Sequence, residues 1–214
     1  MCPCPTRTPC ACLRGCGCRL ASPRSTGCWQ PGSDQYQWLQ ADLAADTNPC
    51  TIAFWHQPLY NTGPEGQATN MQAIWSLLVS HGGVLVLNGH DHDYQRYAPL
   101  DWSGQPNANG VVEIIAGSGG HGIQTTQNPS LQPQPIMSDF NPGDFGALKL
   151  SLSAGTAKVE FWRATDTATP YDSSTFTCLP PPVQPPPAPS LTVTPSDSHD
   201  YANGSTVGSV RSSV

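Results

Sequence analysis

Val84-Leu85-Val86-Leu87-Asn88-Gly89-His90-Asp91-His92 is the stretch of the chain that decides its fold class. Its first four residues are all apolar, which is typical of a strand buried on both faces of a sheet. The two histidines that follow stand at positions i and i+2, so in an extended segment both imidazoles point to the same side. Because neutral imidazole is the commonest metal-binding side chain, the stretch predicts a buried strand that ends in a metal-binding loop.

The sequence on both sides of this stretch predicts helices that alternate with strands. Residues 33–43 predict a helix that Ser33 caps, and residues 70–80 predict a second helix with one apolar face. Apolar strands separated by helices indicate an α/β fold whose sheet is covered on both faces. The second half of the chain, rich in Gly, Pro and Ser, is expected to contain more strand than helix. Strands are expected at residues 51–55, 84–87, 111–116, 147–152 and 158–162.

A third histidine, His56, directly follows the predicted strand at residues 51–55. Open α/β sheets bind their ligands beyond the carboxyl ends of the strands, so His56, His90 and His92 are expected to converge on one metal site. The alternative for His56 is a core histidine bonded to a backbone carbonyl. Asp91 and Asp93 flank the ligands, and either can orient an imidazole by accepting its other N–H; the alternative is a solvated loop acid.

Two segments resemble a known family. Trp55-His56-Gln57-Pro58 and Asn88-Gly89-His90-Asp91-His92-Asp93-Tyr94-Gln95-Arg96 are similar to the C-terminal motifs of calcineurin-like metallophosphoesterases, in particular the purple acid phosphatase-like, secreted bacterial branch. The resemblance extends over roughly residues 27–178. It implies part of a four-layer α/β/β/α sandwich with a dinuclear metal centre between the sheets. It also implies that His56 and His90 bind the second metal and that His92 binds the first.

The resemblance further implies hydrolysis of phosphoric esters with two divalent or trivalent ions of the Fe, Zn or Mn class. The family also has Asp-x-His, Gly-Asp and Gly-Asn-His motifs, which supply the remaining ligands and an acid/base histidine, and none of them precedes the strand at residues 51–55. We therefore expect that the N-terminal half is missing and that the chain is a truncated, inactive fragment. The alternatives are a non-catalytic secreted binding module or remnant, and a single-metal His-x-His enzyme of another fold.

The two ends of the chain differ from its middle. Residues 1–27 hold six of the nine cysteines and show no periodicity; they are interpreted as a thiolate metal site, a disulfide knot or, preferably, a frameshift artefact. Residues 28–178 are the predicted phosphoesterase part, residues 179–190 a proline-rich linker, and residues 191–214 a disordered tail or the start of a truncated module. Disulfide candidates are Cys28, Cys50 and Cys178, whose pairing the sequence leaves open.

Composition excludes some classes of partner. The net charge is −6 with no basic patch, which argues against nucleic-acid binding, and no apolar run is long enough for a membrane span. Few Lys and Glu beside many Ser, Thr, Gln and Asn suit a secreted protein, although the chain has no signal peptide. The Gly-rich loop at residues 117–122 lacks the Lys-Ser/Thr of a P-loop, so we expect it near the site with His121 as a contact to the phosphate-ester substrate. Arg96 is expected to form a structural salt bridge.

Overall fold

The computed structural model describes residues 29–178, which lie within one compact unit. The cysteine-rich segment 1–27, Cys28, the proline-rich linker 179–190 and the tail 191–214 lie outside the described residues. The predictions for those segments and for the domain boundaries therefore stay predictions.

Both predicted helices are present. Helix α1 (Asp34–Ala45) begins after Ser33, whose hydroxyl accepts a hydrogen bond from the backbone N–H of Tyr36 at 3.2 Å. Helix α2 (Gln72–Ser80) follows the short 3₁₀ helix η1 (Thr69–Met71) and buries an apolar face. A local cap at Ser33 thus accounts for the start of α1, and the apolar spacing accounts for the buried face of α2.

A mixed five-stranded sheet forms the centre of the described residues. It consists of β1 (Thr51–Phe54), β2 (Gly83–Asn88), β3 (Tyr94–Arg96), β4 (Val112–Ala116) and β5 (Met137–Asp139), in the order β1-β2-β4-β3-β5. Strands β1, β2 and β4 are parallel, and β3 is antiparallel to both of its neighbours. The carboxyl ends of β1 and β2 therefore meet at the same edge of the sheet.

A second sheet has three antiparallel strands, β6 (Gly146–Ser153), β7 (Thr156–Arg163) and β8 (Asp172–Thr177), in sequence order. The predicted strands at 51–55, 84–87, 111–116, 147–152 and 158–162 correspond to β1, β2, β4, β6 and β7. Strands β3, β5 and β8 were not predicted. Strands β3 and β5 have three residues each, and β8 reads Asp-Ser-Ser-Thr-Phe-Thr, so none carries a strong apolar pattern.

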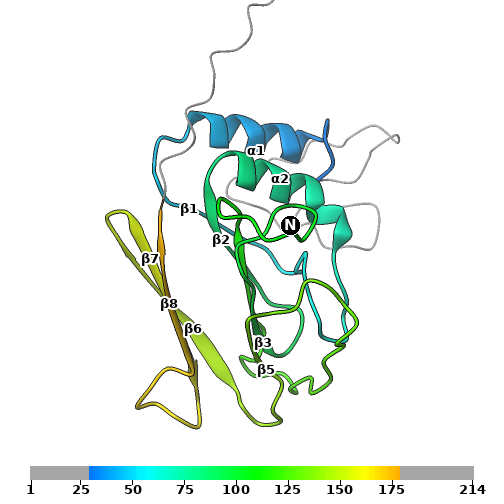
Figure 1. The fold of residues 1–214 in the computed structure, drawn as a ribbon, viewed down its shortest axis with the longest axis vertical. Coiled ribbons are helices and arrows are strands. Elements are labelled where there is room, and N and C mark those ends of the chain that lie inside the picture. The colour runs from blue at the N-terminus through cyan, green and yellow to red at the C-terminus, as the bar shows by residue number, and fades with distance from the viewer. Residues whose placement is uncertain (1–28, 179–214) are drawn as a thin grey trace, which may run out of the picture. The chain divides into compact units, whose positions relative to one another are not determined.

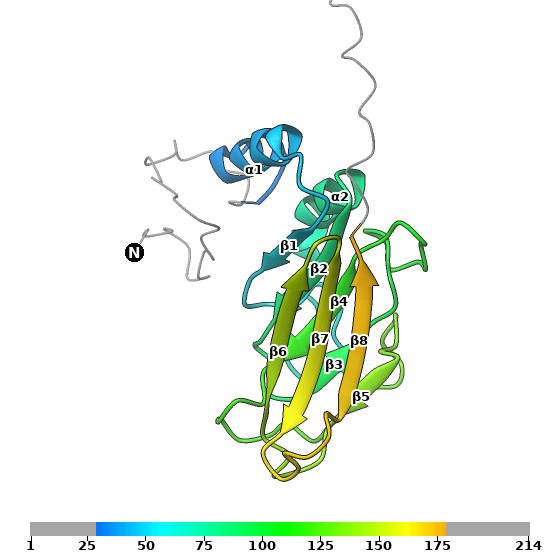
Figure 2. The ribbon, with the colours of Figure 1, turned by 90° about the vertical axis from the view of Figure 1, so that its left-hand side faces the viewer.

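The elements form three layers, with the helices on one face of the five-stranded sheet and the three-stranded sheet on the other (Figures 1 and 2). Side chains of β2 alternate between the two cores: Val86 packs with the helices, whereas Leu85 packs with Val159 and Phe161 of β7. This α/β/β arrangement confirms the predicted fold class as part of a four-layer sandwich. Within residues 29–178 the outer face of the three-stranded sheet has no helix against it.

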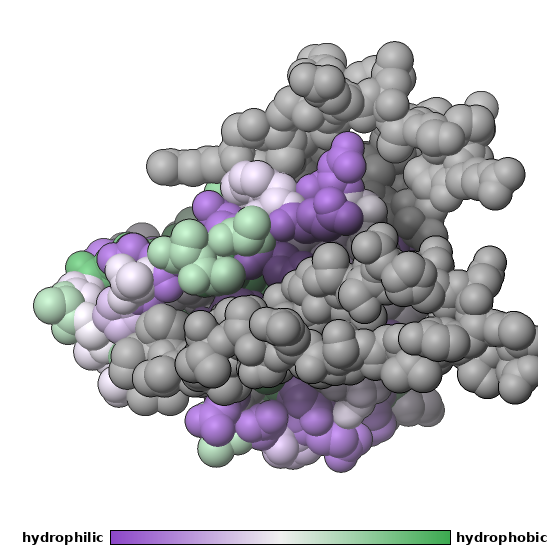
Figure 3. Space-filling model, turned by 90° about the horizontal axis from the view of Figure 1, so that it is seen from above, coloured by the Kyte–Doolittle hydropathy of each residue, from purple (hydrophilic) through white to green (hydrophobic). Residues whose placement is uncertain are grey.

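Two long-range links join the sheets. A disulfide connects Cys50, just before β1, with Cys178, just after β8. Arg96 of β3 donates two hydrogen bonds to the carboxylate of Asp172 in β8, at 2.6 and 2.9 Å, which confirms its predicted structural role. Seen from the α1 end, the described surface is mixed, with hydrophobic areas among hydrophilic ones (Figure 3).

Candidate metal site

The three predicted ligands lie at the carboxyl ends of two neighbouring parallel strands. His56 stands two residues after β1, and His90 and His92 stand two and four residues after β2. A hydrogen bond from the backbone N–H of Gly89 to the carbonyl of His56, at 3.2 Å, fastens the two loops to each other. The parallel pairing of β1 and β2 therefore brings together histidines that are 34 residues apart in the sequence.

The turn that follows β2 is made at His90. This residue has φ = 68°, the only positive φ of a non-glycine residue among residues 29–178. The backbone N–H of Asp91 donates to the carbonyl of Gly89 at 2.9 Å and closes a three-residue turn around His90. Left-handed backbone is uncommon for residues with a Cβ, although histidine tolerates it better than most, and strain of this kind concentrates at functional sites. The turn directs the His90 ring toward His56.

His56 and His90 approach each other closely. Nδ1 of His90 lies 3.2 Å from Nε2 of His56, and the ring centroids are 4.9 Å apart at 72°. Burial lowers the pKa of His56, and the neighbouring His90 and His92 lower it further, which favours the neutral imidazole that a metal requires. Two imidazole nitrogens bound to one tetrahedral ion at about 2.0–2.1 Å would stand roughly 3.4 Å apart, so this pair fits two ligands of a single ion.

His92 is held by the loop that follows β4. The side chain of Gln124 accepts a hydrogen bond from the backbone N–H of His92 at 2.8 Å, and the backbone N–H of Gln124 donates to the His92 carbonyl at 3.0 Å. The His121 ring, expected near the site, lies 4.3 Å from the His92 ring, centroid to centroid. Gly117 touches the carbonyl of Asp91, where a Cβ would come within 1.8 Å of the oxygen. The Gly-rich loop thus supports the histidine loop through close backbone contact.

Glu65 is a carboxylate at the site that sequence reasoning missed. Its Oε2 lies 3.7 Å from Nε2 of His90, and its Oε1 accepts a hydrogen bond from Nε2 of Gln124 at 2.8 Å. Glu65 belongs to an irregular segment between β1 and η1, and no local motif singles it out. His90 therefore has His56 beside one ring nitrogen and the Glu65 carboxylate beside the other, at an ion-pair distance that is longer than a hydrogen bond.

Asp91 and Asp93 point into a buried polar network. The Asp91 carboxylate accepts hydrogen bonds from the side chain of Asn61 and from the backbone N–H of Glu65, and Asp93 accepts from the amide of Gln95 at 3.0 Å. Burial raises the pKa of both acids, that of Asp93 to about 7. Within residues 29–178 no hydrogen bond joins either carboxylate to a histidine, so their role in orienting an imidazole stays a prediction.

The donor set is incomplete for a dinuclear centre. Within residues 29–178, no group of three or more His, Cys, Asp or Glu side chains is arranged to hold a metal ion. The His56–His90 pair fits two positions on one ion, but two cations close together also need anionic ligands to offset their repulsion. Imidazoles are neutral when they bind, so these three histidines do not supply that charge.

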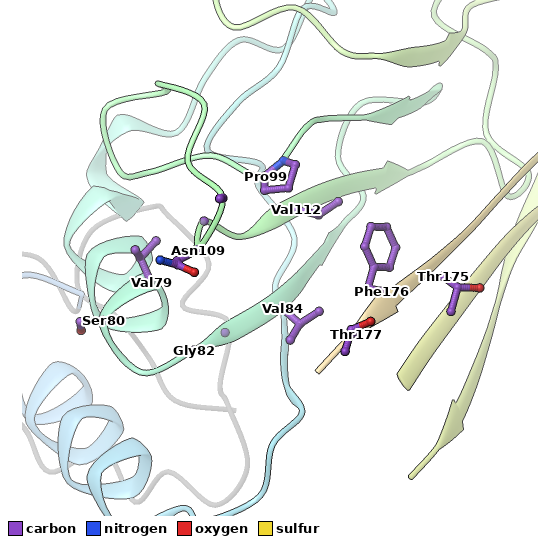
Figure 4. Close-up of a pocket in the computed structure, with 13 residues that line it drawn as sticks. Val79, Ser80, Gly82, Val84, Pro99, Asn109, Val112, Thr175, Phe176 and Thr177 are labelled. Carbon is purple, nitrogen blue, oxygen red and sulfur yellow. The ribbon is translucent and has the colours of Figure 1, made fainter. Parts of the chain in front are cut away.

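A separate cavity of about 510 Å³ lies at the opposite end of the sheet. It is bounded by the amino ends of β2 and β4, the end of α2 and the last residues of β8 (Figure 4). Figure 4 shows Phe176 of β8 beside Val112 and Val84, and no ionisable side chain lines the cavity. Because metal-binding side chains gather at the histidine loops and not along this cavity, the histidine loops are the candidate site.

Fold and site geometry together define a phosphoesterase-like α/β/β sandwich with imidazoles at its strand ends. Sequence comparison agrees. Over 129 residues the chain is 35% identical to Purple acid phosphatase 22 of Arabidopsis thaliana, covering 58% of this chain and 29% of that protein. It is 31% identical over 147 residues to Purple acid phosphatase 18 of the same plant, covering 66% of this chain and 33% of the relative. No family model matches the chain.

Solved structures show the same fold. The purple acid phosphatase PPD1 from yellow lupin (Lupinus luteus) seeds superposes with a TM-score of 0.57 and 23% identity, over 70% of this chain and 29% of that one. The GAP50 protein, the anchor in the inner membrane complex of Plasmodium, superposes with a TM-score of 0.54 and 15% identity, over 67% of this chain and 42% of that one. At these identities the superpositions speak for the fold alone.

The relatives of this chain are thus purple acid phosphatases, proteins of the calcineurin-like metallophosphoesterase fold, over part of their length. This confirms the family resemblance, whereas the bacterial branch stays a prediction because the relatives named here are from Arabidopsis thaliana. The chain spans about a third of the length of these curated relatives. Among the described residues no helix combines the length and the apolar character that crossing a membrane requires.

Proposed function

We propose that this chain contributes three imidazole ligands to the dinuclear metal centre of a phosphoric-ester hydrolase. His56 and His90 would bind one ion and His92 the other. The observation that carries the proposal is the 3.2 Å approach of Nδ1 of His90 to Nε2 of His56, made by two loops at the ends of parallel strands. The kinship to purple acid phosphatases supplies the reaction class.

Bound ions of this kind polarise phosphoryl oxygens and lower the pKa of a bound water. The chain's own residues would present the ligands. The turn at His90 aims its ring, and Glu65 faces the ring nitrogen remote from His56, so Nδ1 stays available. Gln124 forms hydrogen bonds with both the backbone N–H and the backbone carbonyl of His92. Since the described residues offer no bridging carboxylate at the histidines, we propose that the chain alone hydrolyses no ester.

Zinc titration followed by NMR of the histidine rings tests this proposal on the full chain. The ring resonances of His56 and His90 are expected to shift together with one apparent affinity. Alanine at either position should abolish the shift of the other, while His81, at the end of α2, serves as a control that does not respond. A ring-specific signal is needed because the six cysteines at the N-terminus could bind zinc independently.

Two results would contradict the proposal. Independent zinc affinities for His56 and His90 would show that they do not share an ion. Hydrolysis of p-nitrophenyl phosphate by the purified full chain, lost on His56→Ala or His90→Ala, would show that the chain alone is active rather than incomplete.

We also infer that the protein works outside the reducing cytosol. Support comes from the disulfide between Cys50 and Cys178, since disulfides persist mainly in oxidising compartments. A phosphate-ester substrate follows from the reaction class. Free-thiol quantification on the protein isolated from its native source tests the inference: two reactive thiols from these positions would contradict it.

A further inference from the structure

Glu113 is a carboxylate buried in the middle of strand β4. It is 0% exposed and lies within the apolar run that predicts this strand. Val111 and Ile115, two residues before and after it, pack in the core that contains the helices, so the Glu113 side chain enters the same core. Among residues 29–178 no Lys, Arg or His forms an ion pair with it. A buried acid without a cation is costly unless its oxygens are hydrogen-bonded, so its hydrogen-bond partners indicate its role.

Both oxygens of Glu113 accept hydrogen bonds from the loop that follows β1. Oε1 accepts from the backbone N–H of Leu59 at 2.8 Å, and Oε2 accepts from that of Tyr60 at 2.7 Å. Leu59 and Tyr60 are themselves buried, so water does not take the place of these acceptors. The carboxylate therefore does for irregular backbone what a neighbouring strand does for regular backbone, and it does so for residues 54 and 53 positions earlier in the sequence.

The same loop carries two groups of the candidate site. His56 stands at its start and Glu65 near its end, and they lie beside the two ring nitrogens of His90. Further along the loop, the backbone N–H of Thr62 donates to Oε1 of Gln95 in β3 at 3.0 Å. Side chains of β3 and β4 thus hold the irregular backbone between His56 and Glu65, and the β4 side chain holds the part nearer to His56.

A carboxylate suits this task better than a neutral group of the same shape. When it is ionised it accepts at both oxygens, whereas a protonated acid or an amide offers only one good acceptor. Burial raises the pKa of Glu113 to about 8, while its two backbone hydrogen bonds lower it. The titratable groups that face Glu113 within the described residues are the phenols of Tyr60 and Tyr97, and burial raises the pKa of both above the usual 10. Glu113 is therefore the group whose charge changes near pH 8 in this part of the core.

We propose that Glu113 is a positioning residue of the metal site, whose carboxylate holds the loop at Leu59 and Tyr60 so that the ring of His56 faces His90. Loss of either hydrogen bond would free the loop close to His56 and widen the separation of the two imidazoles, which a shared ion does not tolerate. This inference rests on the proposed function for the shared ion only. The placement of the two rings in the metal-free chain depends on the hydrogen bonds alone.

NMR of the full chain in EDTA tests the proposal without a metal. Glu113→Gln keeps the shape of the side chain but sets an amino group against a backbone N–H. The ring resonances of His56 should shift, and the through-space contact between the His56 and His90 rings should weaken. Glu160→Gln is the matched control, because Glu160 is also buried but lies in β7 of the other sheet, where it accepts from Lys158, and it should leave both rings unchanged.

Zinc titration adds a pH profile that a purely structural role would not produce. At about pH 8.5, Glu113→Gln should weaken zinc binding at the His56 and His90 rings about tenfold. At about pH 6.5 the unmodified chain carries a protonated Glu113, so the same substitution should weaken binding less than about twofold. The histidine protons are lost alike in both proteins, and their effect cancels in the ratio of the two affinities.

Two results would overturn the proposal: a ring contact that Glu113→Gln leaves intact in EDTA, and a ratio of zinc affinities that is the same at both pH values. Thermal unfolding shows whether the variant has folded. If it has not, the unmodified chain decides: the amide resonances of Leu59 and Tyr60 and the ring of His56 should move together near pH 8, and a His56 ring that does not move would overturn the proposal too. Rings that bind no zinc would contradict the proposed function, and the measurement in EDTA would then decide on Glu113 alone.

Discussion

Replacement of Gly117 by alanine tests whether a glycine is needed there for the close backbone contact between the Gly-rich loop and the histidine loop. A Cβ at Gly117 would lie 1.8 Å from the carbonyl oxygen of Asp91 and 2.8 Å from its carbonyl carbon. Both obstacles are backbone atoms, so no side-chain rotation relieves the contact. The backbone N–H of Gly117 also donates to the carbonyl of Asp93 at 3.0 Å, which holds the two loops together.

The size of the effect follows from these distances. Ordinary contact requires the two loops to separate by roughly 1.5 Å, which would break or bend the hydrogen bond to Asp93. Overpacking of this kind costs about 1–3 kcal/mol. For a domain of this size the melting temperature should fall by about 2–12 °C. Asp91 lies between His90 and His92, so the ring resonances of both should also shift.

Gly122→Ala is the matched control, because Gly122 belongs to the same loop and a Cβ there meets no atom within 4 Å. Thermal unfolding by circular dichroism and histidine NMR are recorded for both variants beside the unmodified chain. Gly117→Ala should lower the melting temperature and displace the rings, while Gly122→Ala should do neither. Equal melting temperatures and unshifted rings in both variants would refute the reasoning, since the loop would then carry no close backbone contact.

Three further predictions concern acids and cysteines. Burial raises the pKa of Asp93 from 3.8 to about 7, so the folded state binds this proton more tightly than the unfolded state, and the free energy of unfolding should fall as the pH rises from about 4 to 7. Asp93→Asn should make the free energy of unfolding, measured with urea, less dependent on pH in that window. The same pH dependence in the variant and the unmodified chain would contradict this prediction. Cys50→Ser, which opens the 128-residue separation to Cys178, should reduce the free energy of unfolding by about 2–4 kcal/mol, and an unchanged urea midpoint would speak against the link. Glu65→Gln should weaken zinc binding at the His90 ring about tenfold in the NMR titration; identical titration curves would rule out its orienting role.

The helices and the strands that carry an apolar pattern are predictable from the sequence because their signals are local. Ser33 begins α1 through its own hydroxyl, and the uninterrupted apolar run Val84–Leu87 is sufficient to indicate a strand buried on both faces. Strands β3 and β5 could not be read in this way. Each has three residues and exists because β3 is hydrogen-bonded on both sides, to β4 and β5, which is a long-range condition.

The candidate site likewise contains residues that the local sequence predicts and residues that only the folded structure brings there. His56, His90 and His92 were predicted because each follows a recognisable strand and matches a motif, and their role as ligands stays a prediction. Glu65 and Gln124 carry no local signal, because they lie in irregular segments that approach His90 and His92, respectively, only after folding. No local motif predicts that the side-chain amides of Asn61 and Gln95 donate hydrogen bonds to the carboxylates of Asp91 and Asp93, respectively.

The sequence by itself determined the class of fold and the three histidines, since apolar runs and strand-end motifs act over a few residues. Tertiary structure alone decided how the histidines meet. Parallel pairing of β1 with β2 sets His56 beside His90, and the left-handed turn at His90 directs its ring. It also decided that Phe54 and Leu152 stay exposed. The alternation of side chains along a strand fixes which of them face the interior. Whether those side chains are buried depends on which further strands pair with the edge of the sheet, and that is a property of the assembled sheets.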